Sequence, residues 1–567
     1  MFFLFAKRSI SLFHYNEKQL IVQPSDSINV KFIGIRSKKY PFKYNLNFGD
    51  AICQNNASNS IRSSFGQNII GDFRSKTIKN INFLEDQEFS CQCFHTLTEK
   101  QAEILNYLSE NDYRLYFQIK NFKMKQGFHI SEGRYLLTKY KFDIQYVTEV
   151  KSNVVLYKII DINPSQEIGQ QTSYYDNSCI ELQIPPIIKA GTNVSLTFGF
   201  TFTETKLYPP STIQPTFALS SLKLQLLINI AILVFLLYFT PKYSNSFGPL
   251  EEQTDDSIWY YLRGDLFRIP RYISILCTFC GIGVQTIFSL LYTSLKSYSE
   301  FSDVVSAFFN VMSWSGIICG FVSMFTFKYV GGYEWRNVYK SILTLSPSFF
   351  VIIFCIRSLL FIFTKSASIP TNGTILHILL LVLVHTISVS VGSTIGLKFP
   401  INDSPCKVNM IPRHVPAAPF YISSGYLRVY GGIYLFISIL VVILTVNESE
   451  RDNMSLDSPK SFMIMTIFVL ILSSSNISLT FTFLKAKSDD YHWWWTSFLS
   501  PAFVSVVYFI YCVSFSYVSD GFLGFLPLFF NLTDYIFRSA VLFVVCGAAG
   551  FISSFLFLNC IVSQYFI

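Results

Sequence analysis

Two histidines in an apolar stretch are the residues best placed to carry chemistry. His377 and His385 lie eight residues apart, so on a helix their side chains are only about 80° apart around its axis. Two imidazoles in a membrane-spanning helix can carry protons or bind a metal ion along a transport path. Gln285 and Asn476, polar residues in other apolar stretches, would extend that path. The alternative role for the histidines is hydrogen bonding inside a helix bundle, because the only charged residue within the apolar stretches is Arg357.

The sequence contains none of the motifs of common catalytic sites. It has no Gly-rich phosphate loop ending in Lys-Ser/Thr, no His-Glu-x-x-His and no Gly-x-Ser-x-Gly. Cys91-x-Cys93-x-His95 resembles part of a metal site, but a structural zinc ion needs four convergent ligands. Together with Cys53 and Cys179, the two thiols can instead form disulfides in an oxidising compartment, in three alternative pairings. We therefore predict a protein that is not an enzyme and that needs no metal or cofactor.

Small residues recur at helical spacing in the apolar stretches. The motifs are Gly281-x-Gly283, Gly316-x-x-x-Gly320, Gly392-x-x-x-Gly396 and Gly547-Ala-Ala-Gly550. Glycines at this spacing let the backbones of two helices approach closely. One interpretation is packing within the protein's own bundle, and the other is a surface that docks a transmembrane helix of another protein. The two interpretations do not exclude each other.

The composition identifies the elements that must hold these residues. The chain has 567 residues, of which 51% are hydrophobic and 14% are charged. A typical soluble domain carries about 25% charged residues, so the composition excludes a disordered chain, a coiled coil and an ordinary soluble enzyme. It indicates a membrane protein. The net charge of +8 is modest and the basic residues form no dense stripe, so we predict no nucleic-acid partner.

The charged residues are distributed unevenly along the chain. Residues 1–221 have an ordinary charge density, whereas residues 222–567 break into nine long apolar stretches. Each stretch comes close to the roughly 20 residues that cross a bilayer as a helix, which predicts nine helices embedded in lipid. The predicted spans are 224–240, 272–293, 304–327, 342–363, 375–397, 429–446, 461–484, 497–518 and 539–560.

The basic residues between the spans predict the orientation. Most of them lie in the loops after the first, third, fifth and seventh spans, for example Lys242, Arg336 and Lys398. The positive-inside rule places these loops in the cytosol. Residues 1–221 are then lumenal or extracellular, and the C-terminus is cytosolic. A lumenal domain needs an export signal, but Lys7-Arg8 interrupts the apolar start, so we expect the signal peptide to be missing or atypical.

Residues 1–221 are predicted to form a β-rich, β-sandwich-like domain. Apolar and polar residues alternate in 113–119, 140–146 and 194–203, which is typical of strands with one buried face. One helix is expected at Glu99–Glu110. Glycosylation sequons predicted to be lumenal begin at Asn56, Asn193, Asn453 and Asn531. The predicted fold is thus a polytopic α-helical membrane protein with nine transmembrane helices and an N-terminal β-rich lumenal domain.

The predicted cytosolic loops carry motifs that anchoring at the membrane interface does not fully explain. Residues 264–270 lead into the second span, 409–416 precede the sixth, and 490–495 precede the eighth. The residues that define these motifs are Gly264, Asp265, Phe267, Arg268, Pro270, Pro412, Arg413, Pro416, Asp490, Tyr491, Trp493 and Trp495.

Taken in order, these motifs resemble those of the nonaspanins, the transmembrane nine superfamily. Residues 264–270 resemble the family's Gly-Asp-Val-Phe-Arg-Pro-Pro, and 409–416 resemble its Asn-Gln-Ile-Pro-Arg-Gln-Ile-Pro. Residues 490–495 resemble its Asp-Tyr-(His/Arg)-Trp-x-Trp. Three further motifs match at 65–72, 281–285 and 328–335, so the resemblance covers nearly the whole chain. The last six residues lack the Lys-x-Asp-like retrieval signal that is common in the family.

The resemblance implies a role that is not enzymatic. Nonaspanins sort or escort transmembrane cargo, including glycine-rich transmembrane segments, through the Golgi and endosomes, and are linked to adhesion and phagocytosis. The implied partners are transmembrane segments of cargo proteins and cytosolic coat or sorting machinery. The implied location is the Golgi and endosomes or the cell surface. The alternative is a transporter or channel for a small solute or metal ion, and a third hypothesis is an adhesion protein that acts through its lumenal domain.

Overall fold

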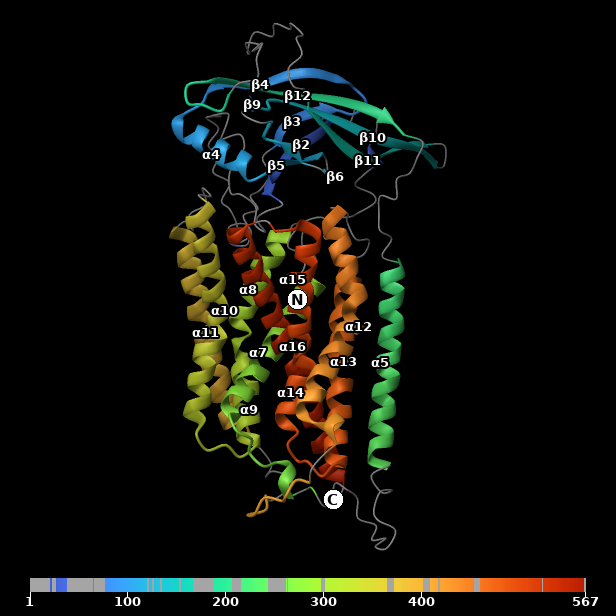
Figure 1. The fold of residues 1–567 in the computed structure, drawn as a ribbon, viewed down its shortest axis with the longest axis vertical. Helices are drawn as coiled ribbons and strands as arrows, with labels where there is room; N and C mark the ends of the chain where they lie inside the picture. The colour runs from blue at the N-terminus through green and yellow to red at the C-terminus, as the bar shows by residue number, and fades with distance from the viewer. Residues whose placement is uncertain are drawn as a thin grey trace.

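A computed structural model describes most of the chain as a β-rich head at one end of a bundle of long helices (Figure 1). The described residues are 21–22, 27–37, 65, 77–119, 122–124, 127–132, 135–151, 154–166, 187–205, 216–242, 262, 264–296, 301–364, 372–400, 408–416, 419–452, 459–522 and 524–564. The head comprises the described residues from 21 to 205, and the bundle comprises those from 216 to 564.

Two sheets form most of the head. The first has five strands in the order β1 (Ile21–Val22), β11 (Val154–Gln166), β10 (Lys139–Lys151), β12 (Asn193–Glu204) and β4 (Gln87–Thr96). The second contains β3 (Thr77–Asn82), β2 (Ser27–Ser37), β5 (Tyr113–Ile119), β6 (Phe122–Lys123) and β7 (Phe128–His129). A small hairpin joins β8 (Ser131–Glu132) to β9 (Tyr135–Leu136). Strands β10 and β12 pair in parallel, whereas the other paired strands are antiparallel.

Aromatic side chains from both sheets share one core, which confirms the predicted alternation. Phe117 of β5 meets Phe142 of β10 edge to face, with 5.3 Å between ring centroids. Phe142 in turn stacks on Phe200 of β12 at 5.0 Å. Helix α4 (Glu99–Glu110) forms where it was expected, because Thr98 and Gln101 close a capping box at its first turn. The two packed sheets and this helix confirm the predicted β-rich domain.

The bundle consists of helices that run roughly along one axis (Figure 1). They are α5 (Thr216–Lys242), α7 (Ile273–Leu295), α8 (Phe301–Trp314), α9 (Gly316–Tyr329), α10 (Trp335–Thr364), α11 (Asn372–Lys398), α12 (Ser424–Asp452), α13 (Pro459–Lys487), α14 (Trp494–Ala502), α15 (Val504–Asp520) and α16 (Phe525–Gln564). A short 3-10 helix, η4 (Phe420–Ile422), precedes α12.

Each predicted span falls within one helix or a pair of successive helices of the bundle. Within the described residues, seven helices are long and apolar enough to cross a membrane, or eight if the bent pair α8 and α9 forms one span. Helix α10 covers the predicted span 342–363 and is 30 residues long. The predicted domain boundary after residue 221 is shifted, because α5 already begins at Thr216. The helical class of the bundle and its embedding in lipid are confirmed.

The head and the bundle contact each other through apolar side chains, among them two aromatic residues and Leu526. Phe530, near the start of α16, is fully buried in the core of the head. Phe65 lies instead against the bundle, 5.9 Å from the ring of Phe309 and 4.4 Å from that of His377. Helix α16 has 40 residues, or about 60 Å, which is longer than a hydrocarbon core of about 30 Å. Its first turns therefore extend beyond the bilayer and support the head.

The predicted modification sites fall partly outside the described residues. Cys53, Cys179, Asn56 and Asn453 lie there, so their modification stays a prediction. Cys91 and Cys93 lie in β4, and Asn193 is the first residue of β12. Asn531 is a correction. It lies inside α16 beside Phe530 and is 8% exposed, and a buried position leaves no room for a glycan.

Candidate functional site

Two of the predicted cytosolic motifs bind each other at the end of the bundle opposite the head. The Arg268 guanidinium donates to the Asp265 carboxylate at 2.6 Å and to the Asn409 carbonyl oxygen at 2.8 Å. The Asn409 amide donates to the Gly264 carbonyl oxygen at 2.9 Å. A Cβ on Gly264 would lie 2.6 Å from the Asn409 side-chain Cγ, so a larger residue here would displace the Asn409 side chain. Asp265 is 2% exposed, and its charge is compensated by Arg268.

The third motif joins the same cluster through its tryptophans. The Trp493 indole N–H donates to the Leu266 carbonyl oxygen at 2.9 Å, and that of Trp495 donates to the Arg271 carbonyl oxygen at 2.9 Å. Trp493 and Trp494 stack on each other with ring centroids 4.1 Å apart, and Trp493 also stacks on Phe551 of α16. We call the set formed by residues 264–271, 408–416 and 490–495 the loop junction. Residues that are far apart in sequence therefore form one unit.

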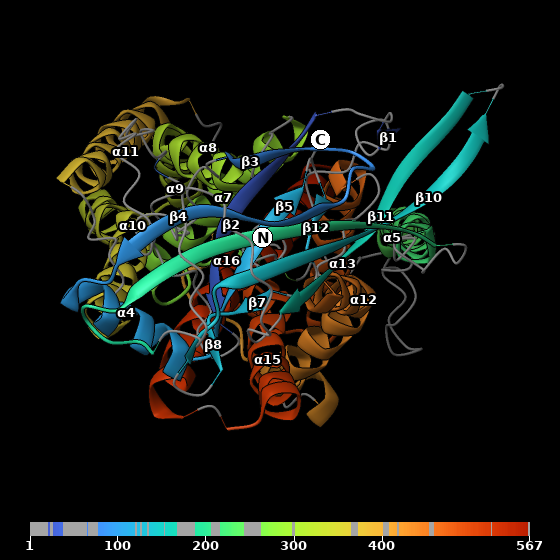
Figure 2. The same cartoon turned by 90° about the horizontal axis from the view of Figure 1, so that it is seen from above.

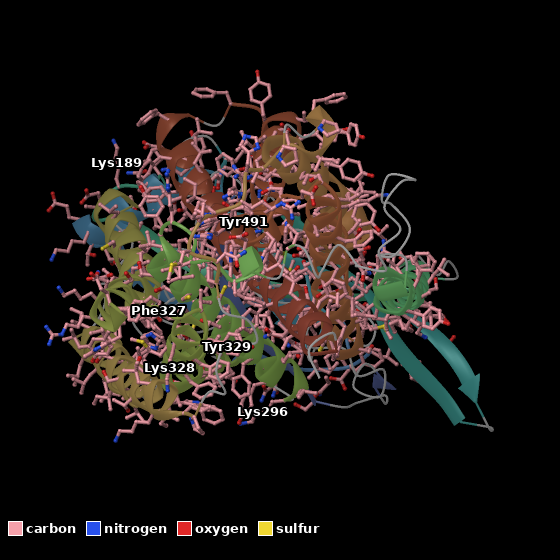
Figure 3. All side chains as sticks on the ribbon, turned by 90° about the horizontal axis from the view of Figure 1, so that it is seen from below. Lys189, Lys296, Phe327, Lys328, Tyr329 and Tyr491 are labelled. Atoms are coloured by element: carbon pink, nitrogen blue, oxygen red, sulfur yellow. The ribbon has the colours of Figure 1, made fainter. Side chains whose placement is uncertain are left out.

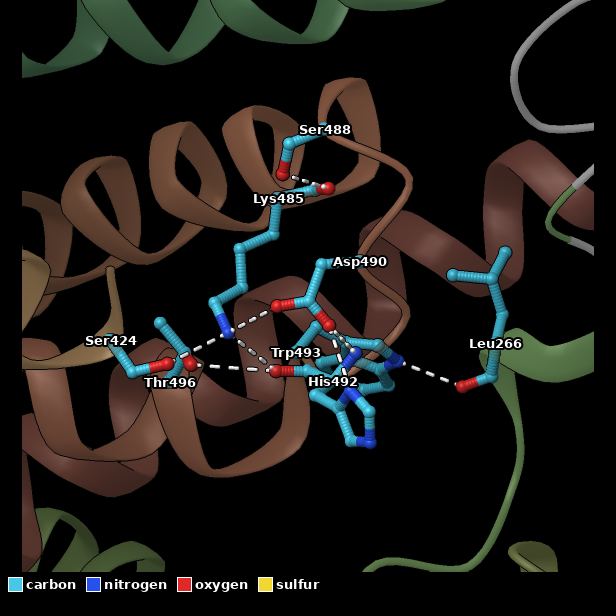
Figure 4. A network of polar contacts seen from close by, with 8 residues as sticks. All are labelled: Leu266, Ser424, Lys485, Ser488, Asp490, His492, Trp493 and Thr496. Atoms are coloured by element: carbon cyan, nitrogen blue, oxygen red, sulfur yellow. Dashed lines mark hydrogen bonds and ion pairs between the residues drawn. The ribbon is translucent and has the colours of Figure 1, made fainter. Parts of the chain in front are cut away.

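A buried lysine, Lys485, lies at the centre of the polar contacts in the loop junction (Figure 4). Its ammonium group donates to Asp490 Oδ2 at 2.8 Å, to Ser424 Oγ at 2.9 Å and to the His492 carbonyl oxygen at 3.2 Å. The residue is 2% exposed although it carries a charge. Asp490 also accepts from the His492 backbone amide at 2.9 Å. This ion pair links the end of α13, the start of α12 and the loop before α14.

The ionisation of Asp490 gives a testable pH dependence. Burial raises the pKa of its carboxyl. Hydrogen bonds from Lys485 and from the His492 amide lower the pKa by more than burial raises it, so the pKa lies below the ordinary value. A carboxyl whose pKa falls on folding stabilises the protein above its unfolded-state pKa of about 3.9 and loses this effect as pH falls through the folded pKa. We expect the difference in melting temperature between the native protein and Asp490→Asn to be constant from about pH 7 to 5 and to shrink below about pH 4. Thermal unfolding in lipid nanodiscs would measure this, and a difference that already declines between pH 7 and 6 would contradict it.

The other motif residues divide into buried and exposed groups. Phe267 and Tyr491 are buried in the same apolar cluster as Trp493. In the view from below, Tyr491 lies near the middle of this end of the bundle (Figure 3). Pro412, Arg413 and Pro416 are exposed, and Pro270 is half-buried.

All eight glycines of the predicted helix-docking motifs face helices of this same chain. Gly316 and Gly320 of α9 lie against His385, Val389 and Ser393 of α11. Gly392 and Gly396 of α11 lie in return against Ile317 and Phe321 of α9. The remaining glycines make similar contacts: Gly281 with Cys319, Gly283 with Val544 and Ala548, Gly547 with Phe498, and Gly550 with Pro501 and Ser497. In this packing the motifs serve the protein's own bundle and leave no glycine surface for the helix of another protein.

Two of the four predicted polar-path residues converge where α8 and α9 meet. These helices bend by 42° at a break around Ser315. A break frees backbone carbonyl groups that need partners inside a membrane. Gln285 of α7 donates its side-chain amide to the Met312 carbonyl oxygen. His385 of α11 lies with Nδ1 3.3 Å from the Ser313 carbonyl oxygen and Nε2 2.6 Å from Ser346 Oγ.

The other two polar-path residues lie elsewhere. His377 lies against Phe65 of the head, with the two rings tilted by 35°. Asn476 of α13 donates to Asn229 of α5, at 3.0 Å to both its backbone and its side-chain oxygen. Among the described residues, the four positions therefore form three separate contacts and not one path. Their observed role is hydrogen bonding and ring packing between helices, which was the alternative role considered for the histidines.

Several residues that hold the site together could not be identified from the sequence alone. In the sequence, Lys485 is only one of many basic residues beside the apolar stretches, and Asn409 is only the first residue of the motif at 409–416. Ser346 and Ser313, which contact His385, had no signal in the sequence, because serines are common in apolar helices. Asn229 is a polar residue within the first predicted span, but the sequence does not indicate that Asn476 is its partner.

Comparisons with known proteins identify the family of the chain. The family model described as endomembrane protein 70 matches residues 41–522. Transmembrane 9 superfamily member 5 of Arabidopsis thaliana is 24% identical over 88% of this chain and 87% of the relative. Member 10 of the same plant is 25% identical over 55% of this chain, and member 2 of Homo sapiens is 25% identical over 56%. The match spans about half the length of these last two relatives, 50% and 49%. No solved structure matches.

Proposed function

The chain belongs to the endomembrane protein 70 family, the transmembrane 9 superfamily, and from this premise we propose that it escorts transmembrane cargo. In this proposal it is not an enzyme, and it works in the Golgi and endosomes with its head in the lumen. A cargo helix docks sideways against the bundle, while cytosolic sorting machinery binds the opposite end.

The observation that carries the proposal is the position of α5, the helix that follows the head. Only 11% of the residues in its most apolar stretch are buried inside the bundle, against 61% for α7 and 72% for α13. Seen from above, α5 stands at the edge of the bundle (Figure 2). Its exposed face carries Leu227 and Val234, which are 64% and 60% exposed. This open flank offers the lateral surface that the glycine motifs do not.

The inner face of α5 is held by polar contacts that resist displacement. Asn229 is buried and accepts hydrogen bonds from Asn476 and from Ser473, the latter at 3.2 Å. Hydrogen bonds of this kind between membrane helices contribute about 1 kcal/mol. They fix which face of α5 meets α13 and which face stays outward. A cargo helix can then pack on the outer face without competing with the bundle itself.

The test compares two equally exposed helix faces. Leu227→Ala with Val234→Ala alters α5, and Leu379→Ala with Leu383→Ala alters α11, where the native leucines are 61% and 59% exposed. In cells that lack the protein, each variant would be expressed with a reporter whose single transmembrane segment is weakly hydrophobic and rich in glycine. Losing about 1 kcal/mol of helix packing lowers occupancy about fivefold. We expect the surface level of the reporter, measured by flow cytometry, to fall only with the α5 variant.

The outcomes separate the site from the function. An equal fall in the surface level of the reporter with both variants would show that the docking surface is not specific to α5. An unchanged reporter with both variants, in a protein that is expressed at the native level, would contradict the escort function. A second reporter with a strongly hydrophobic leucine-rich segment serves as the cargo control and should not respond.

A further inference from the structure

The segment 408–416 between α11 and α12 is fixed in place by contacts at both of its ends. Asn409 exchanges backbone and side-chain hydrogen bonds with Gly264, Asp265 and Arg268. Val415, at its other end, packs against the apolar cluster that contains Trp493. Pro412 restricts the backbone further, because its ring fixes φ. The segment is therefore held at both ends and stiffened between them.

Its largest apolar side chains nevertheless point away from the protein. Met410 is 100% exposed and Ile411 is 82% exposed. A loop that served only to pack against the bundle would turn such side chains inward, since burying them is favourable. Here Asn409 and Val415 make the anchoring contacts, and the side chains of the methionine and the isoleucine stay exposed. A preorganised loop that presents an apolar pair loses little entropy when a partner binds it.

The position of the segment favours a protein partner over the lipid surface. It lies across the end of the bundle that is farthest from the head (Figure 1). Its anchor is the segment before α7, which also accepts the hydrogen bond from Trp493. The neighbouring motif residue Tyr491 lies near the middle of this end (Figure 3). Lipid headgroups surround the outer sides of the helices, whereas Asn409 and Val415 join this segment to the loop before α7 and to the apolar cluster that contains Trp493.

The charges around the segment define the partner further. Arg413 and His414 follow the apolar pair after Pro412 and are exposed. Arg271, Arg336 and Lys398 are also exposed at this end of the bundle. Opposite charges across an interface favour encounter and specificity. An acidic rim on the partner would therefore complement this surface.

We propose that the segment 408–416 docks a cytosolic protein that offers an apolar pocket for Met410 and Ile411, bordered by Asp or Glu residues. The proposal rests on the proposed function only in placing this end of the bundle in the cytosol. It names the side chains through which sorting machinery would bind.

The test begins with a photoreactive amino acid in the full chain in living cells. One variant carries it at position 411 and a control carries it at Tyr333, an equally exposed residue of another loop at the same end.

The cross-linked protein from position 411 is then purified and titrated onto the full chain in phosphatidylcholine nanodiscs. We expect Met410→Ser with Ile411→Ser to weaken binding roughly tenfold or more, as for interface hot spots. Arg413→Glu should weaken binding mainly at low salt, and Tyr333→Ser should leave it unchanged.

The other occupants are outcomes that overturn the proposal. A membrane contact would give cross-links only to lipid. Position 411 would then also become protected from solvent when phosphatidylserine is added to the nanodiscs. Cross-links only between two copies of this chain would show a self-interface. The proposal would also be overturned if the purified partner bound the Met410→Ser, Ile411→Ser variant as tightly as the native chain. Delivery of the reporter is measured separately from binding of the partner. A failure of the escort function can therefore be distinguished from a failure of this docking proposal.

Discussion

Replacing Lys485 with Met is expected to lower the free energy of unfolding by about 3–5 kcal/mol, the usual cost of breaking a buried ion pair from one side. The Lys485 ammonium group is the shared donor for Asp490, Ser424 and the His492 carbonyl oxygen. Methionine has a similar length but no N–H group. The variant therefore leaves a largely buried carboxylate without its counter-charge, and two more acceptors lose a donor.

The measurement is unfolding of the purified protein in nanodiscs, followed by tryptophan fluorescence. Lys487→Met is the matched control, because Lys487 lies two residues later on the same helix and is exposed. A surface change of this kind alters stability by less than about 0.5 kcal/mol. Lys485→Met combined with Asp490→Leu should recover part of the loss, since removing both charges also removes the unpaired carboxylate. Equal stability of Lys485→Met and Lys487→Met would contradict the assigned role.

Local sequence patterns predicted the elements of this protein well, because hydrophobic periodicity is a local property. The alternation through Phe198 and Phe200 predicted which side chains face the core of the head, and both are buried there. The long apolar stretches predicted the helices in the same way. Thr98 with Gln101 shows the same principle at a helix start, since a capping box involves residues only three positions apart.

The contacts between elements could not be predicted, because they depend on pairs of residues that are distant in sequence. Residues 304–327 form one continuous apolar run, yet the chain breaks near Ser315, where Gln285 and His385 supply partners for the carbonyl groups. In the sequence, Lys485 is one of many basic residues beside the apolar stretches. Its structural role depends on its contacts with Asp490 and Ser424. Glycine spacing likewise indicated close helix contact without indicating with which helix.

Gly392→Ala is the second change with a large expected effect, because it adds one methyl group where two helix backbones touch. The nearest atoms to the new Cβ belong to the backbone of Ile317, with its carbonyl carbon at 2.7 Å and its Cα at 2.8 Å. Backbone atoms cannot rotate away as a flexible side chain can, so α9 and α11 must move apart. Overpacking of this kind costs roughly 1–3 kcal/mol. The separation would also strain the contacts of His385 on α11 with Ser313 and Ser346.

Gly425→Ala is the matched control, because a Cβ at Gly425, near the start of α12, meets nothing within 4 Å. Alanine is favoured over glycine in helices by roughly 0.5–1 kcal/mol, so this control should be neutral or slightly stabilising. The pair also decides between the two interpretations of the glycine motifs. Internal packing requires that Gly392→Ala lower the melting temperature in nanodiscs along with any loss of cargo delivery. If Gly392 served only to dock a cargo helix, delivery of the reporter would fall while the melting temperature stayed at the native value.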